Sequence, residues 1–117
     1  TNNSSTNTPQ EIADGIKAIV DKLRTKLPQT KVLILAVFPR GANADDARRK
    51  VNIATNDIAA KYADGKQVFY LDIGPKFLGA DGTLSKEIMP DLLHLSPKGY
   101  QIWADSIEAE VKKLMGE

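Results

Sequence analysis

The sequence contains no cysteine, only one histidine and only one tryptophan. Without cysteine, a disulfide scaffold, a cysteine-ligated zinc site and a thiol nucleophile are all excluded. An excess of one charge is also missing, because 16 basic residues face 15 acidic ones and the net charge is +1. The general electrostatic case for binding nucleic acid or an anionic membrane is therefore absent. No apolar run reaches the roughly 18 residues that a membrane span needs, so no membrane-spanning segment is expected.

What is present is the composition of an ordinary globular domain. Of the 117 residues, 42% are hydrophobic and 26% are charged. This length allows one domain, which we place at residues 1–117. The first eight residues are polar and uncharged, unlike a signal peptide, and the chain does not begin with methionine. We therefore expect it to start inside a longer gene product.

Helices and strands alternate along the chain. Thr8, Pro9 and Glu11 predict a helix start, because they supply a cap, a proline at the first position and the glutamate of a capping box. Ser96 and Pro97 open the last helix in the same way. The patterns predict, in order, a helix over 9–27, a strand over 31–38, a helix over 44–62, a strand over 67–72 and a helix from 97 onward.

Apolar residues at helical spacing predict which face of each helix is buried. On the first helix they are Ile12, Ile16, Ile19, Val20, Leu23 and Leu27. On the second they are Ala47, Val51, Ala54, Ile58 and Ala59. On the last they are Tyr100, Trp103, Ala104, Ile107, Val111 and Leu114. The basic run Arg48-Arg49-Lys50 is expected to lie on a solvated face of the second helix.

The α-β-α-β-α order predicts an α/β fold with a parallel sheet between layers of helices. Two strands are too few for a stable sheet of this kind. The apolar strand Val32–Phe38 would also leave an open edge, which proteins normally cover. We therefore expect preceding strands to be missing from this chain, and the edge of strand 32–38 to pair with an N-terminal fragment or a second chain.

The single histidine, His94, follows Asp91 by three residues, between the second strand and the last helix. Residues three apart in a helical turn face the same side, so Asp91 can hydrogen-bond one ring nitrogen of His94. The other nitrogen would then accept a proton from a nucleophile. The segment follows the carboxyl end of a strand, where open α/β sheets bind ligands. The spacing alone also fits a surface or capping histidine.

The surroundings of His94 resemble a known family. Residues 91–100, Asp-Leu-Leu-His-Leu-Ser-Pro-Lys-Gly-Tyr, resemble the final Asp-x-x-His motif of the SGNH (GDSL-type) hydrolases and the Gly and Tyr that follow it. Thr1-Asn2-Asn3 resembles the remainder of that family's third motif, Gly-x-Asn-Asp. With Leu35–Gly41, these segments are similar to the platelet-activating-factor acetylhydrolase-like esterases. The resemblance implies a three-layer α/β/α flavodoxin-like fold, of which this chain is the C-terminal portion.

The resemblance also implies roles for individual residues. His94 would be the general base, Asp91 would orient its ring, and Asn2 would donate its side-chain amide to the oxyanion. Asn3 stands where the family usually has aspartate, and the family's Gly-Asp-Ser nucleophile motif does not occur in these residues. The implied function is Ser-His-Asp hydrolysis of small acyl esters of carbohydrates or lipids, without a cofactor. The serine would come from a missing N-terminal segment, so this chain alone is expected to be inactive.

Alternatives remain for the site and for the function. The apolar residues around His94 either line an acyl pocket or pack as core under a loop: Phe77, Leu78, Met89, Leu92 and Leu93. The spacing of Asp72, Asp81 and Asp91 matches no standard calcium or zinc pattern, so no metal site is expected. The alternative function is a non-catalytic α/β module that binds a partner through its open strand edge. A flavodoxin-like or receiver-type domain is a third interpretation, without a recognisable phosphate loop or acidic pocket.

Overall fold

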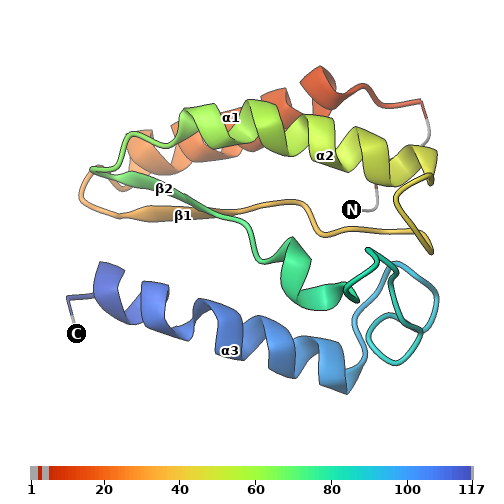
Figure 1. Cartoon of the computed structure of the whole chain (residues 1–117). Helices are drawn as coiled ribbons and strands as arrows, with labels where there is room; N and C mark the ends of the chain where they lie inside the picture. Colours follow the sequence, from red (N-terminus) through yellow and green to blue (C-terminus); the bar gives the residue numbers. More distant parts are fainter. Residues whose placement is uncertain (1–2, 4–5, 117) are drawn as a thin grey trace.

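Helices lie on both sides of a small parallel sheet in the computed structural model, which describes residue 3 and residues 6–116 (Figure 1). The elements are α1 (Pro9–Lys26), β1 (Val32–Leu35), α2 (Ala47–Ala59), the 3-10 helix η1 (Ala60–Tyr62), β2 (Val68–Leu71), the 3-10 helix η2 (Gly74–Phe77) and α3 (Pro97–Leu114). This succession confirms the expected α-β-α-β-α order. None of the helices in the described part of the chain is long and apolar enough to cross a membrane.

The two helix starts that the sequence predicts are confirmed. The Glu11 N–H donates to the Thr8 hydroxyl at 3.2 Å, and the Thr8 N–H donates to the Glu11 carboxylate at 2.9 Å. At the start of α3, the Gly99 N–H donates to the Ser96 hydroxyl at 3.1 Å. These bonds satisfy N–H groups that the first helical turn leaves without partners, so short-range chemistry sets both boundaries.

The sheet separates two clusters of buried side chains. β1 and β2 run parallel, in register from Val32 opposite Val68 to Leu35 opposite Leu71. α1 and α2 lie on one side of the sheet and α3 on the other (Figure 1). The cluster under α1 is built from Val20, Ile34 and Val68. The cluster beside α3 is built from Ile73, Phe77, Leu84 and Met89.

β1 is shorter than the predicted strand because side chains of α2 take over its backbone bonds. The Ala36 N–H still donates to the Leu71 carbonyl at 2.9 Å. At Val37 the Asn56 side chain intervenes: its oxygen accepts from the Val37 N–H at 2.7 Å, and its amide donates to the Val37 carbonyl at 3.0 Å. The Asn52 amide then donates to the Phe38 carbonyl at 3.1 Å. From Val37 onward the chain is therefore fastened to α2 rather than to a strand.

The buried face of α2 is mostly polar, which corrects the expected apolar face; of the apolar residues expected there, only Ala59 is fully buried. Its buried residues are Arg49, Asn52, Thr55 and Ala59, whereas Ala47 at the helix start is exposed. The expectation of a solvated basic run is wrong at Arg49, which is only 2% exposed. The physical reason is that the segment after β1 offers backbone carbonyls, and these need donors rather than apolar cover.

The other helices expose part of their apolar stripes. Exposed fractions are 64% for Ile19, 36% for Leu23 and 51% for Leu27 on α1. On α3, Tyr100 is 55% exposed, although its ring stacks on Trp103 with centroids 5.8 Å apart. Within the described part of the chain these side chains are only partly covered, so apolar periodicity overstates how much of each stripe is buried here.

Truncating Phe77 is expected to destabilise the fold. Its side chain has no exposed surface, and its ring lies 4.8 Å from that of Phe38 between their centroids. Phe77→Ala leaves a cavity beside α3 and should lower the free energy of unfolding by about 3–5 kcal/mol, as cavities of this size do. Urea unfolding measures the change. A loss comparable to that of the exposed variant Ile53→Ala would contradict this packing.

Candidate active site

His94 and Asp91 lie in the loop that leads from the short turn Ser85–Met89 into α3. The Met89 N–H donates to the Ser85 carbonyl at 3.0 Å, and the Met89 side chain is fully buried beneath the loop. At the other end, the Ser96 N–H donates to the Ile88 carbonyl at 2.8 Å. The loop is thus held at both ends, while its centre stays at the surface.

Asp91 and His94 form a hydrogen-bonded pair. The His94 Nδ1 lies 2.6 Å from the Asp91 Oδ2, which confirms that this spacing brings the two side chains together. The other carboxylate oxygen, Oδ1, accepts from the Leu93 N–H at 3.0 Å and from the His94 N–H at 2.7 Å. Because two backbone N–H groups fix the Asp91 carboxylate, a proton on the His94 Nδ1 atom has Asp91 Oδ2 as its acceptor. The Nε2 atom is then the free acceptor of a neutral ring.

These hydrogen bonds also set the charge of Asp91. The bond from the His94 ring, followed by those from the His94 and Leu93 N–H groups, lowers the pKa of Asp91 from 3.8 to about 2. The carboxylate is therefore ionised at neutral pH, as a residue that orients a histidine requires. Both side chains remain accessible in this chain, 62% for His94 and 55% for Asp91.

A pH prediction follows from the Asp91 pKa. Because the pKa in the folded chain lies below the ordinary value of 3.8, the bonds to Asp91 stabilise the fold above about pH 4, and this contribution is lost as the pH falls through about 2. A ¹³C titration of the carboxyl groups by NMR measures it directly. We expect the Asp91 midpoint near 2. A midpoint at 3.8 would contradict the hydrogen bonds described here.

The backbone between the pair is strained. Leu92 has φ of 60°, and among the described residues it is the one non-glycine residue with positive φ. A leucine rarely adopts this conformation unless its surroundings hold it there. Two backbone bonds do so: the Leu92 N–H donates to the Met89 carbonyl at 2.9 Å, and the Gly41 N–H donates to the Leu92 carbonyl at 3.0 Å. The second bond ties the His94 loop to the segment after β1.

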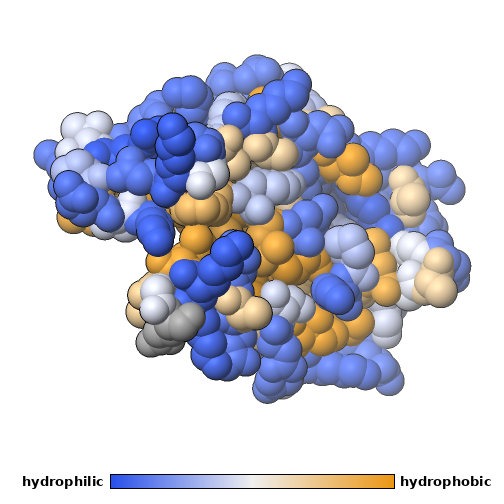
Figure 2. Space-filling model, turned by 60° about the vertical axis from the view of Figure 1, so that its left-hand side comes forward, coloured by the Kyte–Doolittle hydropathy of each residue, from blue (hydrophilic) through white to orange (hydrophobic). Residues whose placement is uncertain are grey.

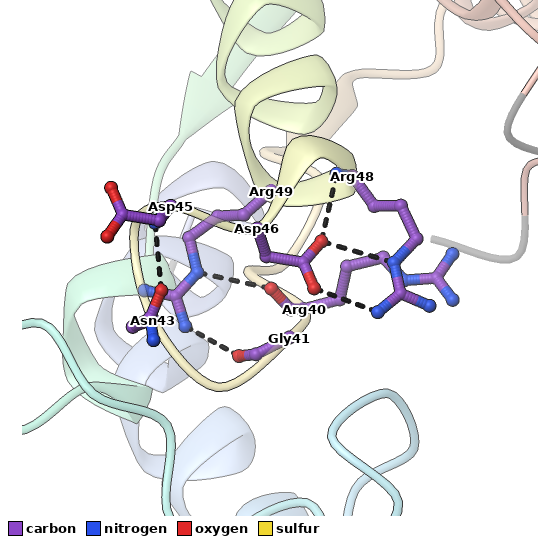
Figure 3. Close-up of polar contacts among 7 residues, drawn as sticks. All are labelled: Arg40, Gly41, Asn43, Asp45, Asp46, Arg48 and Arg49. Carbon is purple, nitrogen blue, oxygen red and sulfur yellow. Dashed lines mark hydrogen bonds and ion pairs between the residues drawn. The ribbon is translucent and has the colours of Figure 1, made fainter.

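The segment after β1 is held by Arg49, a residue that the sequence analysis missed (Figure 3). Its Nε donates to the Arg40 carbonyl at 3.1 Å and its Nη2 to the Gly41 carbonyl at 2.7 Å. Its Nη1 donates to the Gly82 carbonyl in the next loop. Arg48, by contrast, pairs at the surface with Asp46, the cap of α2, at 2.8 Å. The sequence contains a pattern that could have indicated this buried polar face, because Arg49, Asn52 and Asn56 recur at the i, i+3, i+7 spacing of one helix face.

The residues expected to line an acyl pocket lie largely in the core. Phe77 and Met89 have no exposed surface, and Leu92 packs against the same cluster. Leu93 is half-buried. In this chain Phe77 and Met89 therefore pack as core under the loop, which was the alternative to an acyl pocket. They have no exposed surface with which to contact a substrate.

Asn2, the expected oxyanion donor, lies outside the described residues, as do Ser4 and Ser5. The described serines all use their hydroxyls locally. Ser85 accepts from the Glu87 N–H at 3.1 Å, Ser96 caps α3, and Ser106 donates to the Ile102 carbonyl at 2.6 Å. None of these three is paired with His94, as a nucleophile would be.

A pocket of about 190 Å³ lies between α2, the end of β1 and η2, away from His94 and Asp91. Its walls are mostly apolar and include Val37, Ile53, Pro75 and Leu78. In the described part of the chain, no group of three or more histidine, aspartate or glutamate side chains is placed to hold a metal. The pocket wall contains the carboxylate of Asp72, whereas the His94–Asp91 pair lies outside the pocket, at the surface.

Comparisons with known proteins point to one family. The model of the GDSL-like Lipase/Acylhydrolase family matches residues 1–102. The human platelet-activating factor acetylhydrolase IB subunit alpha1 is 32% identical over 115 residues, 98% of this chain and 50% of the human protein. The chicken subunit alpha2 is 34% identical over 115 residues, with the same coverage of 98% and 50%. The chain thus spans about half the length of the curated relatives it matches.

Solved structures share the fold. A Streptococcus pneumonia structure, solved as a platelet activating factor, superposes with a TM-score of 0.71 at 22% identity and covers 87% of this chain and 51% of that one. A GDSL-like lipase from Bacteroides thetaiotaomicron superposes with a TM-score of 0.63 at 19% identity, covering 94% and 55%. At these identities the likeness establishes the fold alone. The α/β layers described above are thus shared with both of these structures.

Proposed function

Because the chain belongs to the GDSL-like lipase/acylhydrolase family, we propose that it forms the histidine–aspartate half of a serine esterase site. In this proposal residues 1–117 are the C-terminal portion of one hydrolase domain. The nucleophilic serine comes from a Gly-Asp-Ser segment that these residues do not contain. The substrates are small acyl esters, such as acetyl esters of a carbohydrate or a lipid.

The proposed reaction is acyl transfer in two steps. The His94 Nε2 accepts the proton of the serine hydroxyl as its oxygen attacks the ester carbonyl carbon. The tetrahedral oxyanion is held by backbone N–H groups of the other segment and by the Asn2 amide. The imidazolium then gives its proton to the departing alcohol, and an acyl-serine remains. His94 next takes a proton from a water molecule, whose oxygen attacks the acyl carbon. The bond between that carbon and the serine oxygen then breaks, the imidazolium returns its proton to the serine oxygen, and the carboxylic acid leaves.

One observation carries the proposal: the 2.6 Å contact between the His94 Nδ1 and the Asp91 Oδ2. A histidine whose Nδ1 faces a fixed carboxylate presents Nε2 as the base, and the carboxylate stabilises the imidazolium that forms. The exposure of both side chains supports a site that is completed by a further segment.

The unpaired edge of β1 is where we place that segment. In a parallel ladder alternate residues point to opposite neighbours, so the backbone groups of Leu33 and Leu35 face away from β2. Asn56 closes this edge at Val37, so Leu33 and Leu35 are the positions of β1 that are open to a new strand. Next to Leu33 lies a hollow of about 380 Å³ with Val111 and Leu114 of α3 in its wall. Figure 2 shows hydrophobic side chains gathered in a hollow between hydrophilic rims.

The test is reconstitution. The coding sequence immediately before Thr1 is read for a Gly-Asp-Ser segment, and the chain is assembled with that segment, as one polypeptide or as two. We expect hydrolysis of p-nitrophenyl acetate by this assembled protein and none by the 117 residues alone. A serine-to-alanine change in the added segment is the control. A start codon directly before Thr1 with no such segment in the genome, or equal activity of the chain alone, would overturn the proposal.

A second function is favoured by the open edge itself. A non-catalytic α/β module could bind a partner strand along Leu33 and Leu35 and keep the His94 loop as structure. In that case the chain and the added segment would form a stable complex by size-exclusion chromatography, yet the complex would hydrolyse no ester above the control.

A further inference from the structure

Arg49 has a bonding pattern that the proposed reaction does not use. The side chain is only 2% exposed. Its three guanidinium nitrogens each donate to a backbone carbonyl, and these carbonyls belong to two different loops. Burial lowers the pKa of Arg49 from its ordinary value. Arginine nevertheless stays charged in proteins, so a cation is fixed beneath the site.

The bonds of Arg49 lead to the His94 loop through Gly41. The Gly41 carbonyl accepts from Arg49, and the Gly41 N–H donates to the Leu92 carbonyl. Glycine is required at this position, because its φ is +77° and a Cβ there would lie 2.3 Å from the Asp46 carboxyl. The peptide group between Arg40 and Gly41 therefore joins the guanidinium to the strained backbone of Leu92, because its carbonyl accepts from Arg49 and its N–H donates to the Leu92 carbonyl.

A second connection runs beside the first. The Ala42 carbonyl accepts from the Leu84 N–H at 3.0 Å, and the Gly82 carbonyl accepts from Arg49. Leu84 belongs to the buried cluster that also contains Met89. Arg49 thus fixes both the segment after β1 and the loop that precedes the Ser85–Met89 turn. Leu92 itself is held by its bonds to Gly41 and Met89, and Arg49 reaches the first of these two residues directly.

We propose that Arg49 is a positioning residue for the base: through Gly41 it holds Leu92 in its strained conformation and so keeps Asp91 and His94 in their hydrogen-bonded arrangement. This inference rests on the proposed esterase function for its kinetic consequence but not for its geometry. Leu92 lies between the two residues of the pair. A relaxed φ at Leu92 would turn the Asp91 carboxylate away from the N–H groups of Leu93 and His94, and from the ring.

Three variants test the positioning role in the assembled protein. Arg49→Met removes the three donors but keeps an unbranched side chain. Arg49→Lys keeps the cation with a different donor geometry. Lys50→Met, the matched control, removes an exposed cation one residue further along α2. We expect Arg49→Met to lower kcat about 100-fold with little change in KM, because misplacing a catalytic group by about 1 Å has this effect. Arg49→Lys should restore part of that loss, and Lys50→Met should match the wild type.

A spectroscopic readout separates positioning from loss of fold. In the full 117-residue chain, the His94 Nδ1 proton bonded to Asp91 should give a low-field NMR signal. This signal should vanish in Arg49→Met and persist in Lys50→Met, while the amide signals of α1 stay unchanged. If Arg49→Met does not fold, Arg49→Lys takes its place, with a weakened signal and about a tenfold lower kcat expected. An unchanged signal and kcat in a folded Arg49 variant would overturn the inference. If Arg49→Met loses the signal but His94 proves to have no role in turnover, the proposed function is overturned and the positioning of the pair by Arg49 is not.

Discussion

His94→Ala is expected to abolish ester hydrolysis by the assembled protein. The imidazole is the group that removes the serine proton and later protonates the leaving alcohol, so both chemical steps lose their proton carrier. In serine hydrolases of this mechanism the loss of the base reduces kcat by about 10⁴-fold or more. The side chain is 62% exposed, and among the described residues its ring bonds only to Asp91, so the fold should be retained.

The assay is p-nitrophenyl acetate hydrolysis under saturating substrate, with circular dichroism to compare the folds. Lys98→Ala is the matched control, because Lys98 is an exposed residue in the first turn of α3 whose ammonium contacts the Glu87 carboxylate at 3.2 Å. We expect the control to retain wild-type kcat. Activity that persists in His94→Ala at the control's level would mean that another group serves as the base.

Asp91→Asn is expected to lower kcat by about 10³–10⁴-fold while keeping the loop folded, as loss of the orienting carboxylate does in this mechanism. The asparagine carbonyl oxygen can still accept from the Leu93 and His94 N–H groups, as Oδ1 does now. Its NH₂ group would then face His94 Nδ1, which must become an acceptor. The ring proton would move to Nε2, and the base would point its proton at the nucleophile.

The same substitution at Asp81 supplies the control for Asp91→Asn. Asp81 is also an exposed loop aspartate, and its Oδ1 accepts from the Thr83 N–H at 3.1 Å, two residues on. Asp81→Asn should therefore leave kcat unchanged. ¹⁵N chemical shifts of the His94 ring report which nitrogen carries the proton. Equal kcat values for the two variants, or an unaltered tautomer in Asp91→Asn, would refute the role of Asp91.

The parts of the fold that follow from neighbouring residues were predictable. The caps at Thr8 and Ser96 depend on side chains within three residues of the N–H groups that they satisfy. The Asp91–His94 contact is equally local and was anticipated from spacing alone. In each case the partners are brought together by one turn of backbone, and distant packing is not needed.

The predictions that were wrong concern features that depend on contacts between segments distant in the sequence. The predicted strand 31–38 ends early because Asn56, 19 residues further on, bonds to the backbone of Val37. Arg49 reaches the Gly82 carbonyl across 33 positions. Apolar periodicity detects only helix faces that are buried by hydrophobic side chains. It therefore does not detect a helix face whose polar side chains donate hydrogen bonds to a buried loop.

The most direct test of the central claim, that this chain carries the general base of an acyl-transfer site, is the single-turnover rate of acylation. The assembled protein is mixed with p-nitrophenyl acetate, and the acetyl group on the added serine is followed by mass spectrometry. We predict rapid acylation with the wild-type chain and a rate reduced by about 10⁴-fold or more with His94→Ala. Equal acylation rates for the two chains would contradict the account.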